Sequence, residues 1–309
     1  MYLGDMINNT GMAGSAEATI VKRIGRIKGA MYEVAAIMSD PRMQAMGGMA
    51  GAWDIWERSL VPSLLANCGS WVGISKKAIE LVDETQNLYC RLIYSCPSST
   101  PKPSLRGEAG LLNCEHRIML EKVCLVSNII FCHTEKENYA RDILQEQLRQ
   151  GWQGLAQEVV DICKKIGLPN ACLEYVHRKK VCEAILMSHL QVLKKEYDMK
   201  KLKHLQHTDI RFRQSYMNIS SLEYARIEFK YRTNMLDNRA NMGKKYSEKN
   251  CVHCTAGILE GVVETSQHWF ECSVYEPLRR GLDPELVLED RVKFILRVQK
   301  LRAELEKNI

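Results

Sequence analysis

The sequence predicts a mainly α-helical fold, made of a helical bundle, a helical linker and a small C-terminal unit, with a minor β-hairpin at the N-terminus. Two observations support this prediction. Aromatic residues make up only 7% of the 309 residues, so Leu, Ile, Val and Met must fill most of the core, which favours helices over sheets. Apolar residues also recur at spacings of three and four along several segments, which is the period of an amphipathic helix.

Residues 1–135 are expected to form the helical bundle. A helix is predicted over about residues 16–39, where apolar residues recur at helical spacing: Ile20, Ile24, Ile27, Met31, Val34 and Met38. A second apolar helix follows over about 52–71, and Pro62 should kink or interrupt it. Helices starting at Ser75 and covering about 115–133 complete the bundle. The stretch YLGDMI before an Asn-Asn-Thr-Gly turn predicts a hairpin element near residues 2–8.

The bundle contains a segment that is expected to lack regular structure. Three prolines fall within the seven residues from Pro97 to Pro103. Proline fixes φ and has no N–H to donate, so such a cluster favours a stiff, extended connection.

Residues 136–215 are expected to form a helical, basic linker. The sequence GLPN at 167–170 should separate the charged helices that precede it from a long helix over about 171–206. From His177 to Arg213, ten Lys and Arg residues exceed four acidic residues by six, which equals the net charge of the whole chain. A basic stripe of this kind predicts a phosphate-binding surface, although an ordinary solvated helix face would carry the same pattern.

Residues 216–309 are expected to form the C-terminal unit. Ser220 and Glu223 have capping-box spacing at the start of a helix with the sequence SLEYARIEFKYRTNML. The charged amphipathic sequence LEDRVKFILRVQKLRAELEK predicts a closing helix. Between these two helices lies the segment that carries the clearest chemistry.

Four metal-ligand residues define this segment: Cys251, Cys254, His268 and Cys272. Two residues separate the first pair, so a tight turn can point both sulfurs at one ion. His268 and Cys272 are four residues apart and share one face of a helix that Thr265 can cap. Three thiolates and one imidazole make a closed tetrahedral set, which is typical of structural zinc sites. We therefore predict one structural Zn²⁺.

Several function classes are excluded or disfavoured. The chain contains no phosphate-binding Gly-rich loop with a Lys, no G-x-S-x-G motif and no legible set of acids for two-metal chemistry. We therefore expect that it is not an enzyme. It contains neither a signal peptide nor an apolar run long enough to cross a bilayer. Its twelve cysteines should then be reduced, and we expect an intracellular protein, nuclear or cytoplasmic, that is not secreted and has no membrane partner.

The sequence resembles the C-terminal portion of reverse transcriptases from retrotransposons without long terminal repeats. In that family an Arg-Thr-x-Met-Leu stretch precedes a Cys-Cys-His-Cys zinc knuckle, and here these residues are Arg232, Thr233, Met235 and Leu236, followed by the quartet, Tyr275 and Arg279. YLGDMI at 2–7 resembles the hairpin that ends the palm, and SLVPSLLANCGSW, ending at Trp71, resembles a thumb helix. The segment after the thumb matches at Ser99, Thr100, Pro101, Leu105, Glu108 and Gly110.

The resemblance implies a thumb-like domain, a linker and a zinc knuckle, but not the fingers and palm that carry the polymerase aspartates. It implies a nucleic-acid-binding protein, with RNA or DNA as partner, that is catalytically inactive alone. The residues expected to contact nucleic acid are Lys22, Arg23, Arg26, Arg178, Lys179, Lys180, Lys194, Lys195, Lys200, Lys201, Lys203 and Arg232.

Other functions remain open at this point. One is a helical protein-interaction module in which zinc has a purely structural role. Another is a fragment of an active reverse transcriptase whose true start lies upstream, or a chain that works with a separate palm. A missing palm would also leave apolar surface near residues 2–7, which predicts possible self-association.

Overall fold

The computed structural model describes residues 11–131, 138–169, 175–199, 212–218, 221–238, 241, 249–251, 254, 262–284 and 287–306. Within these ranges the chain is helical and contains no β-strand, apart from a single antiparallel bridge between Asn250 and Val263. The mainly α-helical prediction is therefore confirmed. The hairpin expected at residues 2–8 lies outside the described residues.

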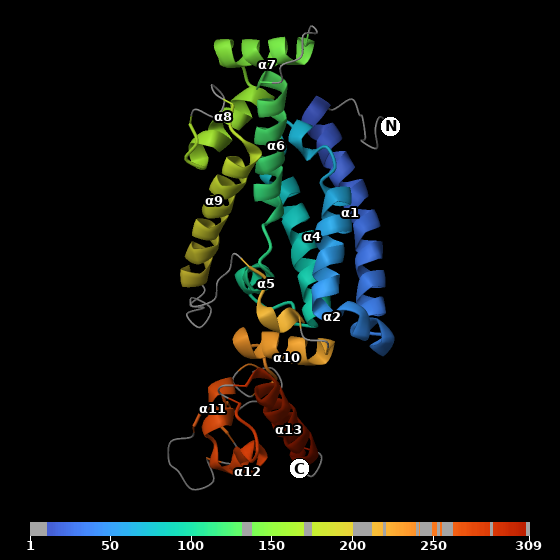
Figure 1. Cartoon of the computed structure of the whole chain (residues 1–309), viewed down its shortest axis with the longest axis vertical. Helices are drawn as coiled ribbons and strands as arrows, with labels where there is room; N and C mark the ends of the chain where they lie inside the picture. The colour runs from blue at the N-terminus through green and yellow to red at the C-terminus, as the bar shows by residue number, and fades with distance from the viewer. Residues whose placement is uncertain are drawn as a thin grey trace. The chain divides into compact units, whose positions relative to one another are not determined.

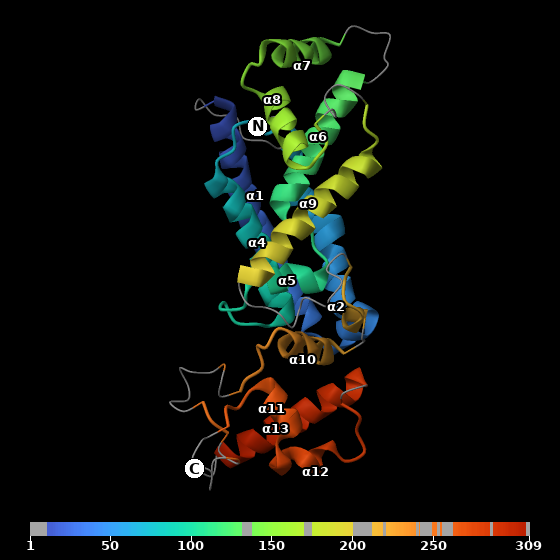
Figure 2. The same cartoon turned by 90° about the vertical axis from the view of Figure 1, so that its left-hand side faces the viewer.

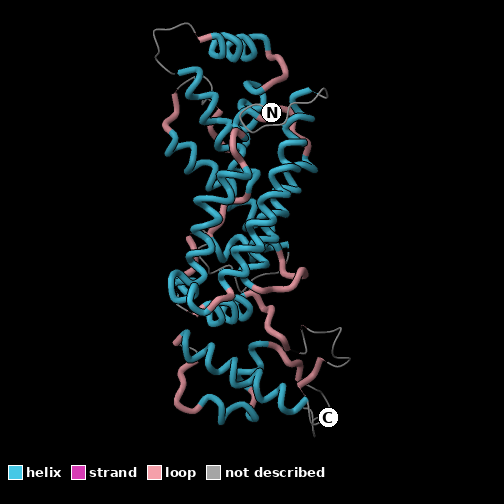
Figure 3. Tube along the Cα trace, turned by 90° about the vertical axis from the view of Figure 1, so that its right-hand side faces the viewer, coloured by secondary structure: helices cyan, strands magenta, loops and turns pink. Residues whose placement is uncertain are grey.

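The chain divides into two compact units, and both are built from helices (Figures 1 and 3). The first unit comprises residues 1–39, 51–93 and 101–214, and the second comprises residues 40–50, 94–100 and 215–309. The finer division at 135 and 215 expected from the sequence stays a prediction.

The helices that lie wholly or partly in the first unit are, in chain order, α1 (Gly11–Met38), α2 (Pro41–Ile55), the π-helical turn η1 (Trp56–Leu60), α3 (Val61–Leu64), η2 (Cys68–Ser70), α4 (Lys76–Tyr94), α5 (Lys102–Ala109), α6 (Cys114–Phe131), α7 (Tyr139–Gln150), α8 (Leu155–Lys165) and α9 (Arg178–Met199). The first ten residues of α2 and the last residue of α4 fall in the second unit. The second unit also contains η4 (Ser215–Asn218), α10 (Leu222–Arg232), α11 (Ser266–Glu271), η5 (Ser273–Tyr275), α12 (Glu276–Arg279) and α13 (Leu288–Glu306).

Helix α1 confirms the periodicity seen in the sequence. Its six predicted core residues, from Ile20 to Met38, are all buried. Its solvent-facing side contains Gly25 and Gly29, both exposed, and a Cβ built at either position meets no atom within 4 Å. Glycine is about 1 kcal/mol less favourable than alanine inside a helix, so packing within the described structure does not require these two residues.

Pro62 deforms the second predicted helix without interrupting it. The backbone N–H of Val61 bonds to the carbonyl of Trp56, so the turn before the proline is π-helical. A proline ring crowds the carbonyl four residues earlier and supplies no N–H, and the wider turn relieves both problems. The rings of Trp53 and Trp56 pack on Tyr89 of α4, which fixes this helix to the bundle.

The segment from Pro97 to Pro103 lacks regular structure as far as Pro101, as predicted, but α5 begins at Lys102, so the end of the segment is helical. Pro103 lies in the first turn of α5, where a missing N–H breaks no helical hydrogen bond. Gly110 ends the helix with φ of 63°, the left-handed conformation typical of a C-terminal glycine. Residues 103–109 are all buried, and the guanidinium of Arg106 pairs with Glu196 of α9 at 2.8 Å.

Helices α6, α7, α8 and α9 share one hydrophobic cluster, in which Val123, Val159 and Ile185 are almost fully buried. The charged helices predicted over 136–166 are present as α7 and α8, and the break at GLPN follows α8. Helix α9 begins at Arg178 rather than near 171. Figure 2 shows α9 running beside α6 and α5.

Two histidines are buried where α6 meets α9. Nδ1 of His116 lies 2.5 Å from Oδ1 of Asn113, and its ring packs edge-on against His189 with centroids 5.2 Å apart. Burial lowers the pKa of His116 to about 4 and the pKa of His189 to about 3. Burial also raises the pKa of Asp83, on α4, to about 6. Both imidazoles are therefore neutral in the folded chain at neutral pH.

These pKa values predict that acid destabilises the first unit. In the unfolded chain a histidine titrates near pH 6.5, so between about pH 6.5 and 4 the unfolded state binds the extra protons and stability falls as pH falls. Asp83 acts in the opposite sense below about pH 6, which leaves a net slope of roughly 1.4 kcal/mol per pH unit. Urea unfolding across this range measures it.

The variant His189→Leu should flatten this pH dependence. His177→Asn, which replaces an exposed histidine while keeping an acceptor at the start of α9, should leave the slope unchanged. An equal slope in the wild-type chain and His189→Leu would contradict the assignment to the buried pair.

Candidate metal centre

The first part of the centre is a short antiparallel pairing in the second unit. The N–H of Cys251 bonds to the carbonyl of Val262 at 2.8 Å, and the N–H of Glu264 bonds to the carbonyl of Lys249 at 2.9 Å. This pairing closes the loop after Cys251 and brings its thiol close to the start of α11.

The second part is helix α11. The Oγ1 of Thr265 accepts from the N–H of His268 at 3.1 Å, so Thr265 caps the helix as the sequence predicts. The N–H of Cys272 bonds to the carbonyl of His268 at 2.8 Å, which places the two side chains on one face, one turn apart.

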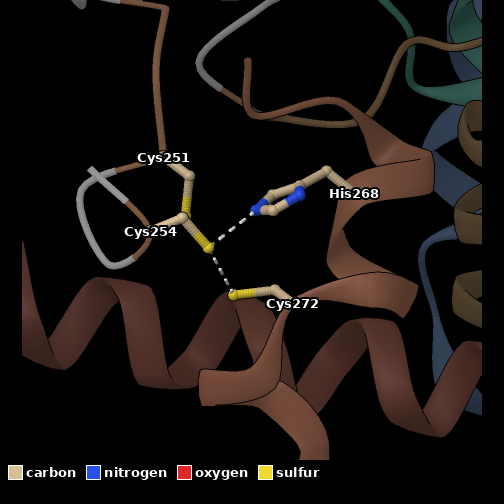
Figure 4. Close-up of side chains that lie close together, drawn as sticks. All are labelled: Cys251, Cys254, His268 and Cys272. Carbon is tan, nitrogen blue, oxygen red and sulfur yellow. Dashed lines mark hydrogen bonds between the residues drawn. The ribbon is translucent and has the colours of Figure 1, made fainter. Parts of the chain in front are cut away.

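The four predicted ligand residues come together (Figure 4). Their ligand atoms all lie within 4.8 Å of one another. The Sγ of Cys254 is 3.5 Å from Nε2 of His268 and 3.5 Å from Sγ of Cys272. Tetrahedral bonds of about 2.3 Å to sulfur and 2.0 Å to nitrogen put ligand atoms roughly 3.5–3.8 Å apart. The quartet can therefore hold one metal ion.

The thiols of the quartet differ in exposure, and the most exposed of them, Cys254, has a raised pKa. Cys251 and Cys272 are almost fully buried, while Cys254 is partly exposed. Burial, together with the hydrogen bond to Cys272 and the charge of the neighbouring thiols, raises the pKa of Cys254 to about 12. The thiol of Cys254 would thus stay protonated at neutral pH, whereas a bound cation would replace its proton and stabilise the thiolate.

A buried ion pair supports the quartet from behind. Trp269 donates from Nε1 to Oε1 of Glu264 at 3.0 Å, and Nε of Arg302 lies 3.1 Å from the same oxygen. The Arg302 guanidinium also lies 5.4 Å from the Trp269 ring centroid and donates to the carbonyl of Asp237. Since Arg302 belongs to α13, this network joins the closing helix to the segment that carries His268.

A second polar network fixes the start of α11. The Nδ2 of Asn238 donates to Oγ of Ser266 at 3.0 Å, and this hydroxyl donates to Oδ1 of Asn234 at 3.2 Å. Asn234 has φ of 53°, a left-handed conformation that asparagine tolerates better than most residues. These hydrogen bonds therefore connect the turn after α10 to the start of α11.

Helix α10 joins the same core, although its cap differs from the prediction. Ser221, not Ser220, caps it, because Oγ of Ser221 accepts from the N–H of Tyr224 at 3.3 Å. Ser220 lies outside the described residues. Glu228 is buried and makes two contacts of 3.1 Å with Arg291 of α13.

The residues that carry the family resemblance have structural contacts in this unit. Thr233 donates to the carbonyl of Phe229 at 2.7 Å, and Leu236 and Tyr275 are buried in the core. Arg279 donates to the carbonyl of Phe270 and lies 5.9 Å from the Phe294 ring centroid. Arg232, expected to contact nucleic acid, is half-buried, with its guanidinium 5.7 Å from the Tyr216 ring centroid.

The other predicted nucleic-acid contacts differ in exposure. Arg23 does not fit the prediction, because it is buried, donates to the carbonyl of Ala66 at 2.5 Å and packs against Trp71. Lys22 is half-buried and Arg26 is exposed. On α9 the side chains of Arg178, Lys179, Lys180, Lys194 and Lys195 are exposed, whereas Lys200, Lys201 and Lys203 lie outside the described residues.

Sequence reasoning missed the residues that hold the quartet in place. Glu264, Arg302 and Asn238 are polar residues in loops or on a charged helix, and no spacing rule pairs them across the chain. Among the described residues, no second group of three or more metal-ligand side chains converges on one point.

Comparisons with known protein families, with curated proteins and with solved structures found no match for this chain. Among the described helices, none is long and apolar enough to span a membrane. The geometry of the site is therefore the main guide to function.

We predict that the purified chain contains about one zinc per molecule. His268→Ala and Cys254→Ala should each lose the metal and unfold the second unit locally, because structural zinc supplies folding free energy. Elemental analysis and limited proteolysis measure both effects. Cys182→Ala, which removes a partly exposed thiol of α9, should keep the full metal content. A metal-free wild-type chain prepared without chelator would contradict the prediction.

Proposed function

We propose that this chain is a zinc-stabilised nucleic-acid-binding protein, similar to the C-terminal portion of a retrotransposon reverse transcriptase and catalytically inactive by itself. The observation that carries the proposal is the convergence of Cys251, Cys254, His268 and Cys272, whose ligand atoms all lie within 4.8 Å of one another and include two separations of 3.5 Å. The order of the quartet after Arg232 and Thr233 matches the family pattern.

The metal is proposed to be Zn²⁺ with a structural role. Three sulfurs and one nitrogen satisfy the preference of zinc, and a full set of four protein ligands leaves no open position for water or substrate. The buried Glu264–Arg302 pair and Trp269 would then hold the ligand-bearing segment rigid.

Exposed cations of the first unit are proposed to contact phosphate. On α9 they occur near both ends, at 178–180 and 194–195, and on α1 Arg26 and Lys28 lie between the exposed glycines Gly25 and Gly29. Because glycine has no side chain, a nucleic-acid backbone can approach this face of α1 closely. Contacts of this kind bind phosphate without reading sequence, so binding should depend steeply on salt.

The lack of catalysis is part of the proposal. No set of converging acids is legible in the sequence, and Asp5 lies outside the described residues. Asp83 has a structural partner, since its carboxylate accepts from the N–H of Cys114 at 2.8 Å.

We also propose an intracellular location, nuclear or cytoplasmic. The self-association surface expected at residues 2–7 lies outside the described residues.

A protein-interaction module is the second candidate, and α7 is the observation that favours it. Tyr139 and Ile143 lie one turn apart on this helix, and Trp152 follows it; all three side chains are more than half exposed. Large apolar side chains that are exposed along one short segment often mark protein contacts.

A salt titration tests the proposed function. A labelled 20-nucleotide RNA or DNA should bind the full chain at 50 mM salt, with affinity falling linearly on a log–log plot as salt rises. Changing Lys194 and Lys195 together to Gln should reduce the slope by about 1.4 to 1.8, because each phosphate that is no longer neutralised lowers it by roughly 0.7 to 0.9.

Lys102→Gln is the matched control, because Lys102 is exposed at the start of α5, pairs with Glu84 and lies outside the proposed contacts. It should leave the slope unchanged. Absence of binding to any nucleic acid at 50 mM salt would reject the proposed function and favour the protein-interaction module.

A further inference from the structure

The start of α9 combines an exposed ring with a cluster of cations. Tyr175 is 58% exposed. Lys179 and Lys180 are exposed, and the side chain of Arg178 is 56% exposed although it pairs with Glu121 at 2.6 Å. The pairing with Glu121 offsets only one of three cations within six residues, so this surface keeps an excess of positive charge.

The Tyr175 ring is held in place at the end of α6. It meets the ring of Phe131 edge-on, with centroids 6.2 Å apart and an interplanar angle of 78°. This contact orients the ring, while more than half of the side chain still faces solvent. An oriented, exposed aromatic ring loses little conformational entropy when a second flat group stacks on it.

A cavity of about 820 Å³ adjoins the cluster within the first unit. Its walls come from Glu57–Ser70 and α6, and Arg178 lines it as well. Leu125 and Asn128 line the α6 wall and lie on the face that continues, three residues later, to Phe131. The cavity and Arg178 thus lie along the middle of α6, where Arg178 pairs with Glu121, and Tyr175 contacts Phe131, the last residue of this helix.

The chemistry of this surface selects its ligand. An excess of cations favours a polyanion, and an oriented ring favours flat aromatic groups that expose a face. Single-stranded nucleic acid has both properties, because its bases are free to stack on protein rings. In a duplex each internal base is already stacked between its neighbours, so it offers no face to Tyr175.

We propose that the surface formed by Tyr175, Arg178, Lys179 and Lys180 binds single-stranded nucleic acid. One base stacks on Tyr175, the phosphates beside it contact Lys179 and Lys180, and the cavity lined by Arg178 and Asn128 receives the next nucleotide. This inference rests on the proposed function, which it deepens by naming the strand state of the ligand and a stacking residue.

Fluorescence anisotropy with the full chain tests this inference. The probes are a labelled 12-nucleotide oligouridine and a labelled 12-base-pair duplex, both at 50 mM salt. Tyr175→Ala should weaken oligouridine binding roughly 5- to 150-fold, the usual loss for one stacked base. Tyr175→Phe should bind like the wild-type chain, because the ring and its stacking face remain.

Charge and fold controls accompany these variants. Lys179→Gln with Lys180→Gln should lower the salt slope for the single strand by about 1.4. Tyr139→Ala, which removes an exposed tyrosine from α7, should leave binding unchanged. Tyr175→Phe keeps the ring contact with Phe131 and should keep the wild-type melting temperature, and Tyr175→Ala, which loses one edge contact of a mostly exposed side chain, should melt close to it.

The same titrations separate failure of the stacking site from failure of nucleic-acid binding as a whole. If Tyr175→Ala binds oligouridine as tightly as the wild-type chain, or if the duplex binds at least as tightly as the single strand, this inference is wrong while nucleic-acid binding stands. If neither probe binds at 50 mM salt, the proposed function itself is wrong.

Discussion

The second unit depends on one constraint: two cysteines near an antiparallel bridge must meet a histidine and a cysteine on the next helix. Three thiols and one imidazole whose ligand atoms lie within 4.8 Å of one another are poorly satisfied without a metal, because thiols are weak hydrogen-bond donors and acceptors. A cation satisfies them by converting the thiols to bound thiolates. The core of the unit, with Trp269, Tyr275 and Phe294, packs around this point.

The rest of the unit holds the ligand-bearing segments at their required separation. Helix α13 contributes Arg302 to the buried pair with Glu264 and Arg291 to the pair with Glu228. Removing one member of a buried pair leaves an uncompensated charge, which typically costs about 3–5 kcal/mol, so these pairs fix one arrangement of helices. The first unit has a core of its own, in which α6 to α9 bury apolar residues. The candidate metal centre therefore belongs to the second unit, whereas the proposed nucleic-acid contacts of α1 and α9 belong to the first.

Sequence reasoning succeeded where a periodic or local rule applied. The apolar stripe of α1 follows from spacing alone, and the metal quartet follows from a Cys-x-x-Cys turn and an i, i+4 pair on a capped helix. It failed where a distant contact decided the outcome. Helix α5 accommodates Pro103 because this residue lies in its first turn, and burial against α9 then stabilises the helix. Arg23 was predicted to be a surface cation, but it is buried because its guanidinium bonds to the carbonyl of Ala66 and packs against the ring of Trp71. No local sequence pattern predicts the ion pair between Glu264 and Arg302, because the two residues are 38 positions apart in the chain.

Binding of one tetrahedral zinc ion by the quartet is central to the proposed role of the second unit. X-ray absorption at the zinc edge of the purified chain tests it most directly, because it reports ligand type and bond length without requiring activity. We predict three sulfur ligands at about 2.3 Å and one nitrogen ligand at about 2.0 Å. A first shell of oxygen and nitrogen only, or a six-coordinate ion, would contradict zinc binding by these four residues.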